Sequence, residues 1–449
     1  LSAAHALSSA SSDNNDNIEV TVVEASPKVG GLVRDGFTTI SGDRPAEAGQ
    51  HGFWNNYYNI YKLLNDLPNM DIQNVLTDFA PQGQYSPKGL EAVWPIYKDQ
   101  PVKLPTGLAQ AAYTKFNNLS IQDRITAFPL VLAFSEFDDS LEAWEKFDKV
   151  SFRDLCIRLG VSKKCYEEAF EPMILTGLFA PGAQCSAAAA LGMAYFFVLK
   201  SQTSFDVQWC RGNIGDKIFA PWVEVMEESG VTFQTNTRVI GFDTNDNNNI
   251  HSIKCSKTTK EGESPEEFTM EADKVIFAVG GEALSTMVRY SPDLAKYPEF
   301  RQFANLRGTS VLATRIFLDR IISLPYTANA CWGFDDGVGM TMFDITSLHG
   351  TECSTVKGAP GTVIEVDYYH ASNLLVMDDD AILQKVKKDV DTMLKQEGCT
   401  SANVVDAAIV RLPNAVNWYY PGSYQFMPDV QSKDLQNVYF VGDIVRTRH

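Results

Sequence analysis

The chain has 449 residues, of which 45% are apolar, enough core for about three domains by the usual length per domain. Its 38 Lys and Arg residues against 56 Asp and Glu residues give a formal net charge of −18, which argues against nucleic-acid binding and against simple electrostatic docking on anionic lipid. No apolar run reaches the about 18 residues that a membrane-spanning helix needs.

Cysteine and histidine spacing predicts neither a disulfide framework nor a metal site. No two cysteines form C-x-x-C, no histidine lies at ligand spacing from them, and the six histidines are dispersed. We expect free thiols of a reducing compartment. The eight cysteines are Cys156, Cys165, Cys185, Cys210, Cys255, Cys331, Cys353 and Cys399.

The first candidate site lies near the start of the chain. Leu1–Ala10 has small residues at helical spacing, and Ile18–Val23 has the β-branched composition of a buried strand that ends in Glu24. An acidic residue at a strand end accepts hydrogen bonds from ribose in dinucleotide-binding folds, and the glycine pair Gly30-Gly31 lets backbone N–H groups approach a phosphate. An ordinary strand with a surface Glu and a turn is the alternative.

In a nucleotide-binding βαβ unit, the loop G-x-G-x-x-G precedes the first helix. Here the helical segment begins at Leu1, without that loop. We therefore expect the chain to be a fragment, with a central first strand and the phosphate loop upstream.

The segment 46–64, AEAGQHGFWNNYYNIYKLL, predicts a loop that leads into a helix. It follows an expected β-ribbon at Gly36–Ile40. Gly49 and Gly52 flank His51 and precede Trp54, and glycines interleaved with polar and aromatic residues suit a backbone that lies against a flat ligand. A structural turn followed by core aromatic residues explains the pattern equally well.

The rest of the chain alternates strand-like and helical stretches. Residues 78–105 predict strands, and residues 108–200 predict an inserted helical domain whose Phe, Leu and Met residues form a core or line a site for a long apolar substrate. Further on, the sequence predicts a helix at Ile214–Glu228, strands at Val231–Gln234, Thr237–Phe242 and Phe268–Val279, more strands at Arg301–Leu324 and Gly361–His370, an amphipathic helix at Asp379–Gly398, and a buried strand at Val438–Asp443.

Three pieces in this order, VEA…GG, ADKVIFAVGG and NVYFVGD, resemble the FAD-containing amine oxidase and carotenoid desaturase superfamily. The stretch AEAGQHGFWNNYYNIYKLLNDL is similar to the E-x-G-x-H-x-F-F…Y-x-N-x-x-x-L segment of phytoene and zeta-carotene desaturases. The resemblance covers most of the chain and is specific at the flavin motifs. It implies an α/β fold with a Rossmann-type FAD-binding domain assembled from discontinuous segments (1–77, 206–290 and 413–449), a mixed-sheet substrate domain (78–107 and 291–412) and a helical insertion (108–205).

The resemblance also implies roles for individual residues. Glu24 would accept the adenosine ribose hydroxyls, and Glu47 and His51 would belong to the segment that faces the isoalloxazine ring. The other implied cofactor-binding residues are Gly30 and Gly31 along the pyrophosphate, Arg34 at a phosphate, Gly49 at the flavin, Val239 at adenine, Gly280 at the second crossover, and Gly442 with Asp443 at the ribityl chain. Three positions depart from the family pattern: Leu32 stands in place of Arg, Gln50 in place of Leu, and Gly280-Gly281 in place of proline. The closing aromatic residue and glycine run of the family would lie beyond His449.

The resemblance implies an FAD-dependent oxidoreductase that moves hydride from a saturated carbon of a long apolar isoprenoid to the flavin. His51 would take a proton or pack on the ring, and Glu47 would take part in catalysis or form a structural salt bridge. Trp54 and the run Trp418-Tyr419-Tyr420 would line the substrate pocket, with core packing as the alternative. The electron acceptor would be a quinone or oxygen, the location a plastid or otherwise the cytoplasm, and any peripheral membrane contact would rest on an apolar patch.

Other functions remain open on the same residues. A flavin amine oxidase, including a polyamine oxidase, would need an acidic or aromatic cage for a cation, and Trp418-Tyr419-Tyr420 is its candidate. A carotenoid isomerase would use reduced flavin without net oxidation. A flavoprotein-like scaffold would bind a lipid or a partner without turnover.

Overall fold

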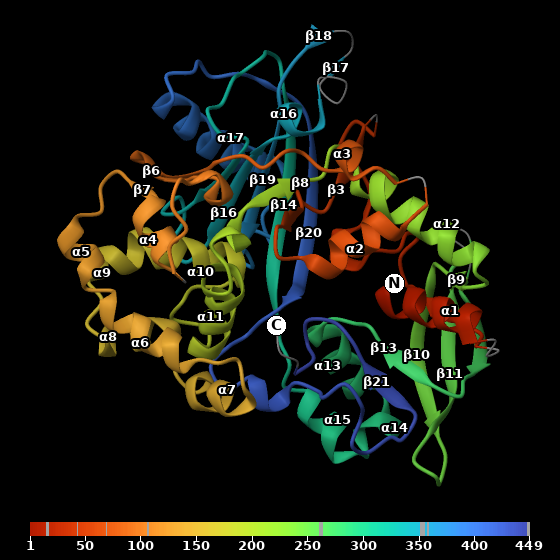
Figure 1. The fold of residues 1–449 in the computed structure, drawn as a ribbon. Coiled ribbons are helices and arrows are strands. Elements are labelled where there is room, and N and C mark those ends of the chain that lie inside the picture. Colours follow the sequence, from red (N-terminus) through yellow and green to blue (C-terminus); the bar gives the residue numbers. More distant parts are fainter. Residues whose placement is uncertain are drawn as a thin grey trace.

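The fold is known from a computed structural model, shown in Figure 1. Cys353 and His449 lie outside the residues that it describes. The described residues are 1–14, 18–42, 44–68, 70–105, 107–259, 264–350, 355–356 and 359–446.

An eight-stranded mixed sheet forms the centre of the molecule, in the order β20-β14-β19-β16-β15-β5-β6-β7. Strand β14 pairs antiparallel with both β19 and β20, so strands from the second half of the chain form one side of the sheet. Strand β15 pairs parallel with β5, which brings the predicted strands of residues 78–105 into the same sheet. The strands are β5 Gln82–Ser86, β6 Gly89–Trp94, β7 Lys115–Phe116, β14 Gly308–Leu318, β15 Ala328–Cys331, β16 Gly339–Asp344, β19 Val363–Tyr369 and β20 Val404–Asn417.

Helix α17, Asp379–Gln396, covers one face of this sheet, as the amphipathic pattern predicts. Asp378 caps it by accepting a hydrogen bond from the backbone N–H of Ala381 at 2.8 Å. Its apolar stripe packs against β14, β16 and β19 and is buried at Ile382, Val386, Val390 and Leu394.

The strands of the predicted FAD-binding segments (1–77, 206–290 and 413–449), here called the nucleotide-type part, lie below the large sheet in Figure 1. They form two parallel strand pairs and an antiparallel sheet. Strand β1, Thr21–Val23, pairs with β9, Thr232–Gln234, and β13, Val275–Phe277, pairs with β21, Val438–Phe440. The predicted single strand at 268–279 is wrong: it is two strands, because the charged stretch at 271–274 separates β12 from β13. The antiparallel strands are β10 Thr237–Thr244, β11 Ile250–Lys257 and β12 Glu266–Glu271.

The predicted helical insertion is present and lies on the left of Figure 1. Serine side chains at positions 120, 140, 151, 162 and 186 accept backbone N–H groups at the starts of helices α5, α7, α8, α9 and α11, which explains where these helices begin. Its elements are α4 Leu108–Tyr113, α5 Ile121–Ile125, α6 Phe128–Glu136, α7 Leu141–Asp148, α8 Phe152–Arg158, α9 Lys163–Cys165, α10 Glu171–Gly177, α11 Ala187–Ala194 and π-helical turns at Tyr166–Phe170 and Tyr195–Leu199.

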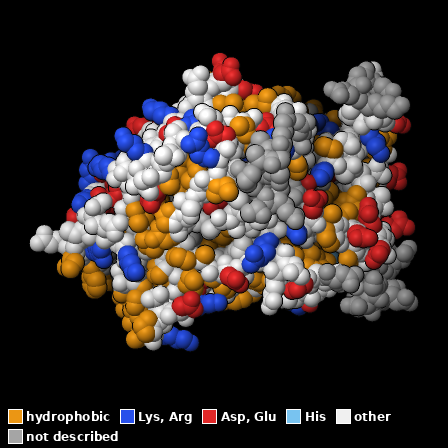
Figure 2. Space-filling model, turned by 90° about the horizontal axis from the view of Figure 1, so that it is seen from above, with side chains coloured by type: hydrophobic (Ala, Val, Ile, Leu, Met, Phe, Trp, Pro, Cys, Tyr) orange, Lys and Arg blue, Asp and Glu red, His pale blue; other side chains and the backbone are white. Residues whose placement is uncertain are grey.

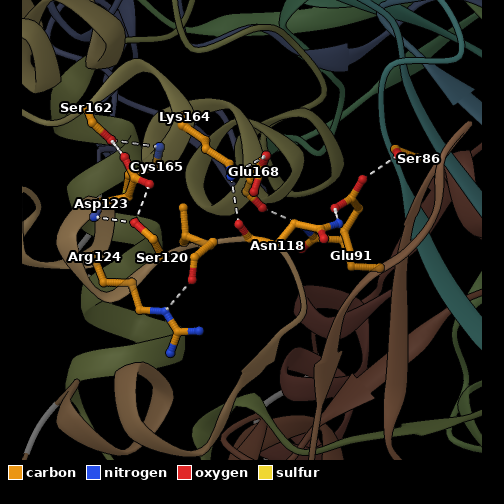
Figure 3. A network of polar contacts seen from close by, with 12 residues as sticks. Ser86, Glu91, Asn118, Ser120, Asp123, Arg124, Ser162, Lys164, Cys165 and Glu168 are labelled. Carbon is orange, nitrogen blue, oxygen red and sulfur yellow. Dashed lines mark hydrogen bonds and ion pairs between the residues drawn. The ribbon is translucent and has the colours of Figure 1, made fainter.

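A polar network fastens the insertion to the edge of the sheet (Figure 3). The buried Glu91 of β6 accepts hydrogen bonds from Ser86 Oγ at 2.5 Å and Asn118 Nδ2 at 2.6 Å. Lys164 Nζ of α9 donates to the carbonyl of Asn118 at 2.7 Å. Strand β6 and helix α9 are therefore held by the same short loop.

Shorter elements surround the start of the chain. The predicted helix, strand and ribbon near the N-terminus are all present, and the ribbon consists of β2 and β3. The remaining elements used below are α1 Ser2–Asn14, β2 Asp35–Thr38, β3 Pro45–Glu47, β4 Gly52–Trp54, α2 Tyr58–Asp66, β8 Val207–Trp209, α12 Ala220–Glu228, α13 Gly281–Tyr290 and α16 Ile345–His349.

The predicted free thiols are confirmed in the described part of the chain, where seven cysteines are free and six of these are buried. Among the same residues, no cluster of side chains is suited to hold a metal ion. No helix of the described residues is long and apolar enough to cross a bilayer.

Candidate cofactor and active site

Glu24 directly follows β1, and its backbone is hydrogen-bonded to both β9 and β10. Its N–H donates to the Gln234 carbonyl and its own carbonyl accepts from Thr237, each at 2.9 Å. The side-chain Oε1 accepts from the backbone N–H of Ser26 at 2.7 Å, which orients the carboxylate at the strand end. Val239 lies on the adjacent β10 opposite Cys255, where the register shifts. The structure thus places Glu24 and Val239 on neighbouring strands.

The glycine pair forms the turn that follows. Gly30 has φ +115°, and a Cβ there would lie 2.9 Å from the Phe219 ring, so any larger residue would be strained and crowded. Gly31 has φ +59°, and nothing lies within 4 Å of its Cβ position. Arg34 donates from Nη1 to the Gly31 carbonyl at 2.9 Å and stacks on Phe37 at 5.0 Å. Its guanidinium therefore holds this turn together.

A second glycine-containing edge lies at the ends of β13 and β21. Gly280 is the N-cap residue of α13, and Gly442, with φ +109°, also has nothing within 4 Å of its Cβ position. Asp443 is accessible to solvent, yet desolvation by the surrounding protein raises its pKa above the usual range. Tyr419 lies beside it and donates its hydroxyl to the Asp443 carbonyl at 2.8 Å.

The segment 47–51 crosses a buried cluster of charged side chains. Arg315 of β14 lies between Glu47 of β3, with Nη1 to Oε1 at 3.4 Å, and Glu365 of β19, to which its Nε donates. Glu47 also accepts the backbone N–H of Ile214 at 3.1 Å. Gly49 has φ +101°, and a Cβ there would lie 3.1 Å from Asp367 Oδ2. Only glycine lets the backbone pass this close to Asp367.

This cluster contains one cation and three carboxyl groups, all buried. Desolvation raises the pKa of Glu47 to about 7 despite the nearby Arg315. Desolvation and the charge of Glu365 raise the pKa of Asp367 well above its usual range, although the backbone of Gln50 donates a hydrogen bond to it. A carboxyl oxygen of Asp367 and one of Glu365 lack a partner among the described residues. We therefore expect Asp367 to be protonated at neutral pH.

His51 and its neighbour Gln50 differ in their hydrogen bonding. Gln50 donates to the Cys210 carbonyl at 3.2 Å, and its Oε1 lies 3.1 Å from His349 Nε2. Desolvation, with a smaller contribution from Arg315, lowers the pKa of His51 to about 4, so the imidazole is neutral at pH 7. Its Nε2 is buried without a partner in the described part of the chain. A neutral imidazole with one unused nitrogen can accept a proton or a hydrogen bond from a bound ligand.

Aromatic side chains continue from this segment into the helical insertion. Trp54 lies 5.3 Å from Phe197, 5.5 Å from Tyr57 and 6.3 Å from Trp209, measured between ring centroids. Phe196 and Phe197, in the π-helical turn 195–199, are 5.0 Å apart and only partly buried. The cluster provides an apolar surface directly after His51.

The predicted run 418–420 lies elsewhere, beside Asp443. Trp418 Nε1 donates to the Gln184 carbonyl at 3.0 Å, and the Tyr420 hydroxyl donates to the Asn305 carbonyl at 2.7 Å. Arg307 already stacks on the Tyr420 ring at 5.1 Å. That Trp54 and residues 418–420 line one substrate pocket stays a prediction.

The described residues fit a flavin nucleotide. Gly31 and Gly442 both leave open space beside the backbone, and His51 and Trp54 each present a buried nitrogen with no partner among the described residues. Sequence patterns did not predict a role for Arg315, Glu365, Asp367 or the aromatic residues around Trp54. The charged residues inside the apolar strands TSVLATRIFL and TVIEVDYYH could have pointed to the buried cluster, because a buried charge requires a partner.

Comparison with known proteins identifies the family. The profile of the "flavin containing amine oxidoreductase" family matches residues 1–449. A 15-cis-phytoene desaturase of Solanum lycopersicum is 20% identical over 311 residues, covering 68% of this chain and 50% of the relative, so the chain spans about half the length of that relative. A cyclohexylamine oxidase from Brevibacterium oxydans IH-35A aligns with a TM-score of 0.61 at 12% identity, covering 98% of this chain and 90% of the other.

A putrescine oxidase solved with bound putrescine aligns with a TM-score of 0.60 at 13% identity, covering 97% of this chain and 90% of the other. These structural likenesses confirm the predicted α/β fold class. Together with the family profile over the whole chain, they lead to one assignment. The chain belongs to the flavin-containing amine oxidoreductase family, whose description names flavin as the cofactor.

Proposed function

We propose that this chain oxidises a long apolar isoprenoid of the carotenoid type, with hydride transfer from a saturated carbon to the flavin. The observation that carries the proposal is the segment 47–57, in which a neutral His51 is followed directly by the aromatic cluster around Trp54. A flavin removes hydride without an ionised protein group, provided that the protein orients the substrate and excludes water. An apolar aromatic surface shared with the insertion suits such a substrate.

The similarity to phytoene desaturases supports the same substrate class, at low identity. In the proposed arrangement Glu24 and Val239 hold the adenosine end, Gly30, Gly31 and Arg34 the pyrophosphate side, and Gly442 with Asp443 the ribityl chain. Gly49 and Gly280 line the flavin. We propose a quinone or oxygen as the electron acceptor, a plastid as the location, and peripheral contact with a membrane as the route of the substrate.

An amine oxidase is the competing function because the structural neighbours include oxidases of cyclohexylamine and putrescine. Its candidate cage, residues 418–420, has both of the hydroxyl groups and the indole N–H bonded to backbone carbonyls, and Arg307 already occupies a face of the Tyr420 ring. A second cation there would be repelled by Arg307. This favours the apolar substrate.

Absorption spectroscopy tests the proposal. The protein, produced from its complete coding sequence, loaded with FAD and kept free of air, is mixed with phytoene in detergent micelles or with putrescine. Bleaching of the flavin bands by phytoene alone supports the proposal, and restoration of the bands by a quinone or by oxygen identifies the acceptor. Bleaching by putrescine alone would establish the amine oxidase instead. Folded protein that binds no FAD would contradict both oxidase functions.

A further inference from the structure

An exposed apolar stripe runs along helices α5 and α6 of the insertion. Ile121, Ile125, Phe128 and Leu132 are spaced at helical intervals and are 73%, 65%, 70% and 63% exposed. Thr126 and Ala127, between the two helices, keep right-handed helical angles, so the stripe is continuous.

The stripe is not explained by the core of the insertion. The opposite side of α6 already supplies Leu130 and Ala133 to that core, where they are 0% and 6% exposed. The amphipathic helix α17 differs in this respect, because its apolar stripe is buried against the large sheet. Large apolar side chains that gather on one exposed helix face mark an interaction surface.

The charge around the stripe differs from that of the chain. Residues 101–136, through the end of α6, and residues 155–168 together hold six Lys and Arg against four Asp and Glu, whereas acidic residues outnumber basic ones in the chain as a whole. Helix α9 lies against α5 through the 2.8 Å hydrogen bond from Ser162 Oγ to Asp123, which brings the exposed Lys163 and Lys164 beside the stripe. Figure 2 shows apolar side chains gathered beside Lys and Arg side chains at the end of the molecule where Figure 1 places these helices.

Local charge decides docking at physiological salt, since charges more than about 8 Å away are largely screened. The overall charge of −18 therefore does not prevent this end from approaching an anionic surface. Asp123 accepts from Ser120 and Ser162, and Glu136 pairs with Lys146. Glu167 pairs with Lys163 at 3.6 Å and Glu168 with Lys164 at 3.9 Å. The exposed pair of Lys163 with Glu167 is weak, so Lys163 can exchange it for a lipid headgroup. Apolar side chains with a basic rim match the acyl and headgroup layers of a lipid bilayer.

We propose that α5 and α6 form a docking surface for a bilayer that contains anionic lipid. The stripe enters the acyl boundary while Lys115, Arg124 and Lys163 meet the headgroups. This surface requires neither flavin nor substrate, so it can be tested apart from the proposed function.

Co-sedimentation with vesicles tests the proposal, using the whole chain and vesicles of phosphatidylcholine alone or mixed equally with phosphatidylglycerol. We expect binding to the mixed vesicles, reduced at least about tenfold in Phe128→Ser/Leu132→Ser, since each change removes one large apolar group from the lipid. The matched control is Ile321→Ser/Val376→Ser, which alters residues 69% and 86% exposed outside the insertion and should bind like the unmodified chain. Lys115→Gln/Lys163→Gln should lose the preference for the anionic vesicles.

Three results would overturn the proposal. The first is no sedimentation with either vesicle by a chain that is folded by circular dichroism. The second is an equal loss in both serine double variants. The third is a dimer in sedimentation velocity that Phe128→Ser/Leu132→Ser dissociates, which would assign the stripe to a second copy of the chain.

Discussion

At the scale of single residues, Arg315 decides the electrostatics of the candidate site. It is the one cation of the buried cluster and interacts with both Glu47 and Glu365. Asp367 follows Glu365 by two residues on β19. Three ionised carboxylates around one guanidinium would leave a net negative charge in a dry interior, which is costly. The raised pKa of Asp367 follows from this arrangement, and we expect its carboxyl to be neutral at pH 7.

Substitution of Asp367 by Asn should therefore be mild. The amide has the shape of the neutral acid and can still accept the hydrogen bond from Gln50, so the free energy of unfolding should change by less than about 1 kcal/mol. Arg315→Met should instead lose about 3–5 kcal/mol, because it leaves the buried carboxylates without a cation. Urea unfolding at pH 7 measures both values. Equal losses in the two variants would mean that Asp367 is ionised.

Glu47 should make stability depend on pH. Its pKa is raised in the folded protein to about 7, so between about pH 4.5 and 7 the folded state holds a proton that the unfolded state has released. Stability from this group is thus present in acid and lost as pH rises through that window, by about 3 kcal/mol. In Glu47→Gln this decrease should be absent. Urea unfolding at pH 5 and pH 8 tests the sign, and an unchanged slope in the variant would refute it.

His51 differs from His349 in having a nitrogen without a partner among the described residues. If this nitrogen accepts a proton during oxidation, His51→Gln should slow flavin reduction by about 100-fold, whereas His349→Gln should stay within about twofold. Stopped-flow absorbance gives both rates. A small effect in His51→Gln, with the flavin spectrum shifted, would assign the ring to packing only.

At the scale of elements, strand β19 shows what the sequence could predict. Its β-branched composition predicted a strand, and the strand is there. All seven residues are buried, because β14 and β16 pair with its two edges and both faces are covered. The partners of its acidic residues lie 50 and more positions away in the sequence, so local patterns could not reveal them. The glycine turns, by contrast, depend on their own backbone angles and were predictable.

The loop that fastens the insertion gives a prediction at the same scale. Glu91→Ala removes the acceptor shared by Ser86 and Asn118, so the loop at 117–120 should open and become a site of limited proteolysis. Glu136→Ala is the control, since its ion pair with Lys146 is on the surface and has little influence on stability. Mass spectrometry of the fragments locates the cuts, and identical digests of the two variants would contradict the prediction.

At the scale of the whole molecule, the fold is assembled from segments that only a resemblance could join. Motifs near residues 24, 280 and 443 were recognisable one by one. The pairing of β13 with β21, however, joins Val275 to Val438, and strands β14 to β20 lie between them in the sequence. The division of the chain into six domain segments stays a prediction. The insertion could be predicted as helical, but its attachment to the sheet through β7 depends on a two-residue strand that no pattern indicates.

FAD binding should be visible in global stability. At a concentration about 100 times its dissociation constant, FAD should raise the free energy of unfolding by about 2.7 kcal/mol. Gly31→Asn should reduce this gain, because a side chain would occupy the open space above the turn. Gly398→Asn is matched, since Gly398 has φ +71° against +59° and also has nothing within 4 Å of its Cβ position. Thermal melts with and without FAD measure the gain, and equal gains in both variants would exclude Gly31 from the cofactor site.

The buried thiols can report the order in which the hydrophobic cores of the molecule unfold. Burial raises the pKa of Cys156, Cys210 and Cys331, and each belongs to a different hydrophobic core: the core that includes the insertion, the N-terminal core and the core of the large sheet. A protonated, enclosed thiol does not react with an alkylating agent until its surroundings open. The labelling rate at each cysteine therefore measures how fast its own core opens, and the three rates rank the cores by resistance to opening without any introduced cysteine.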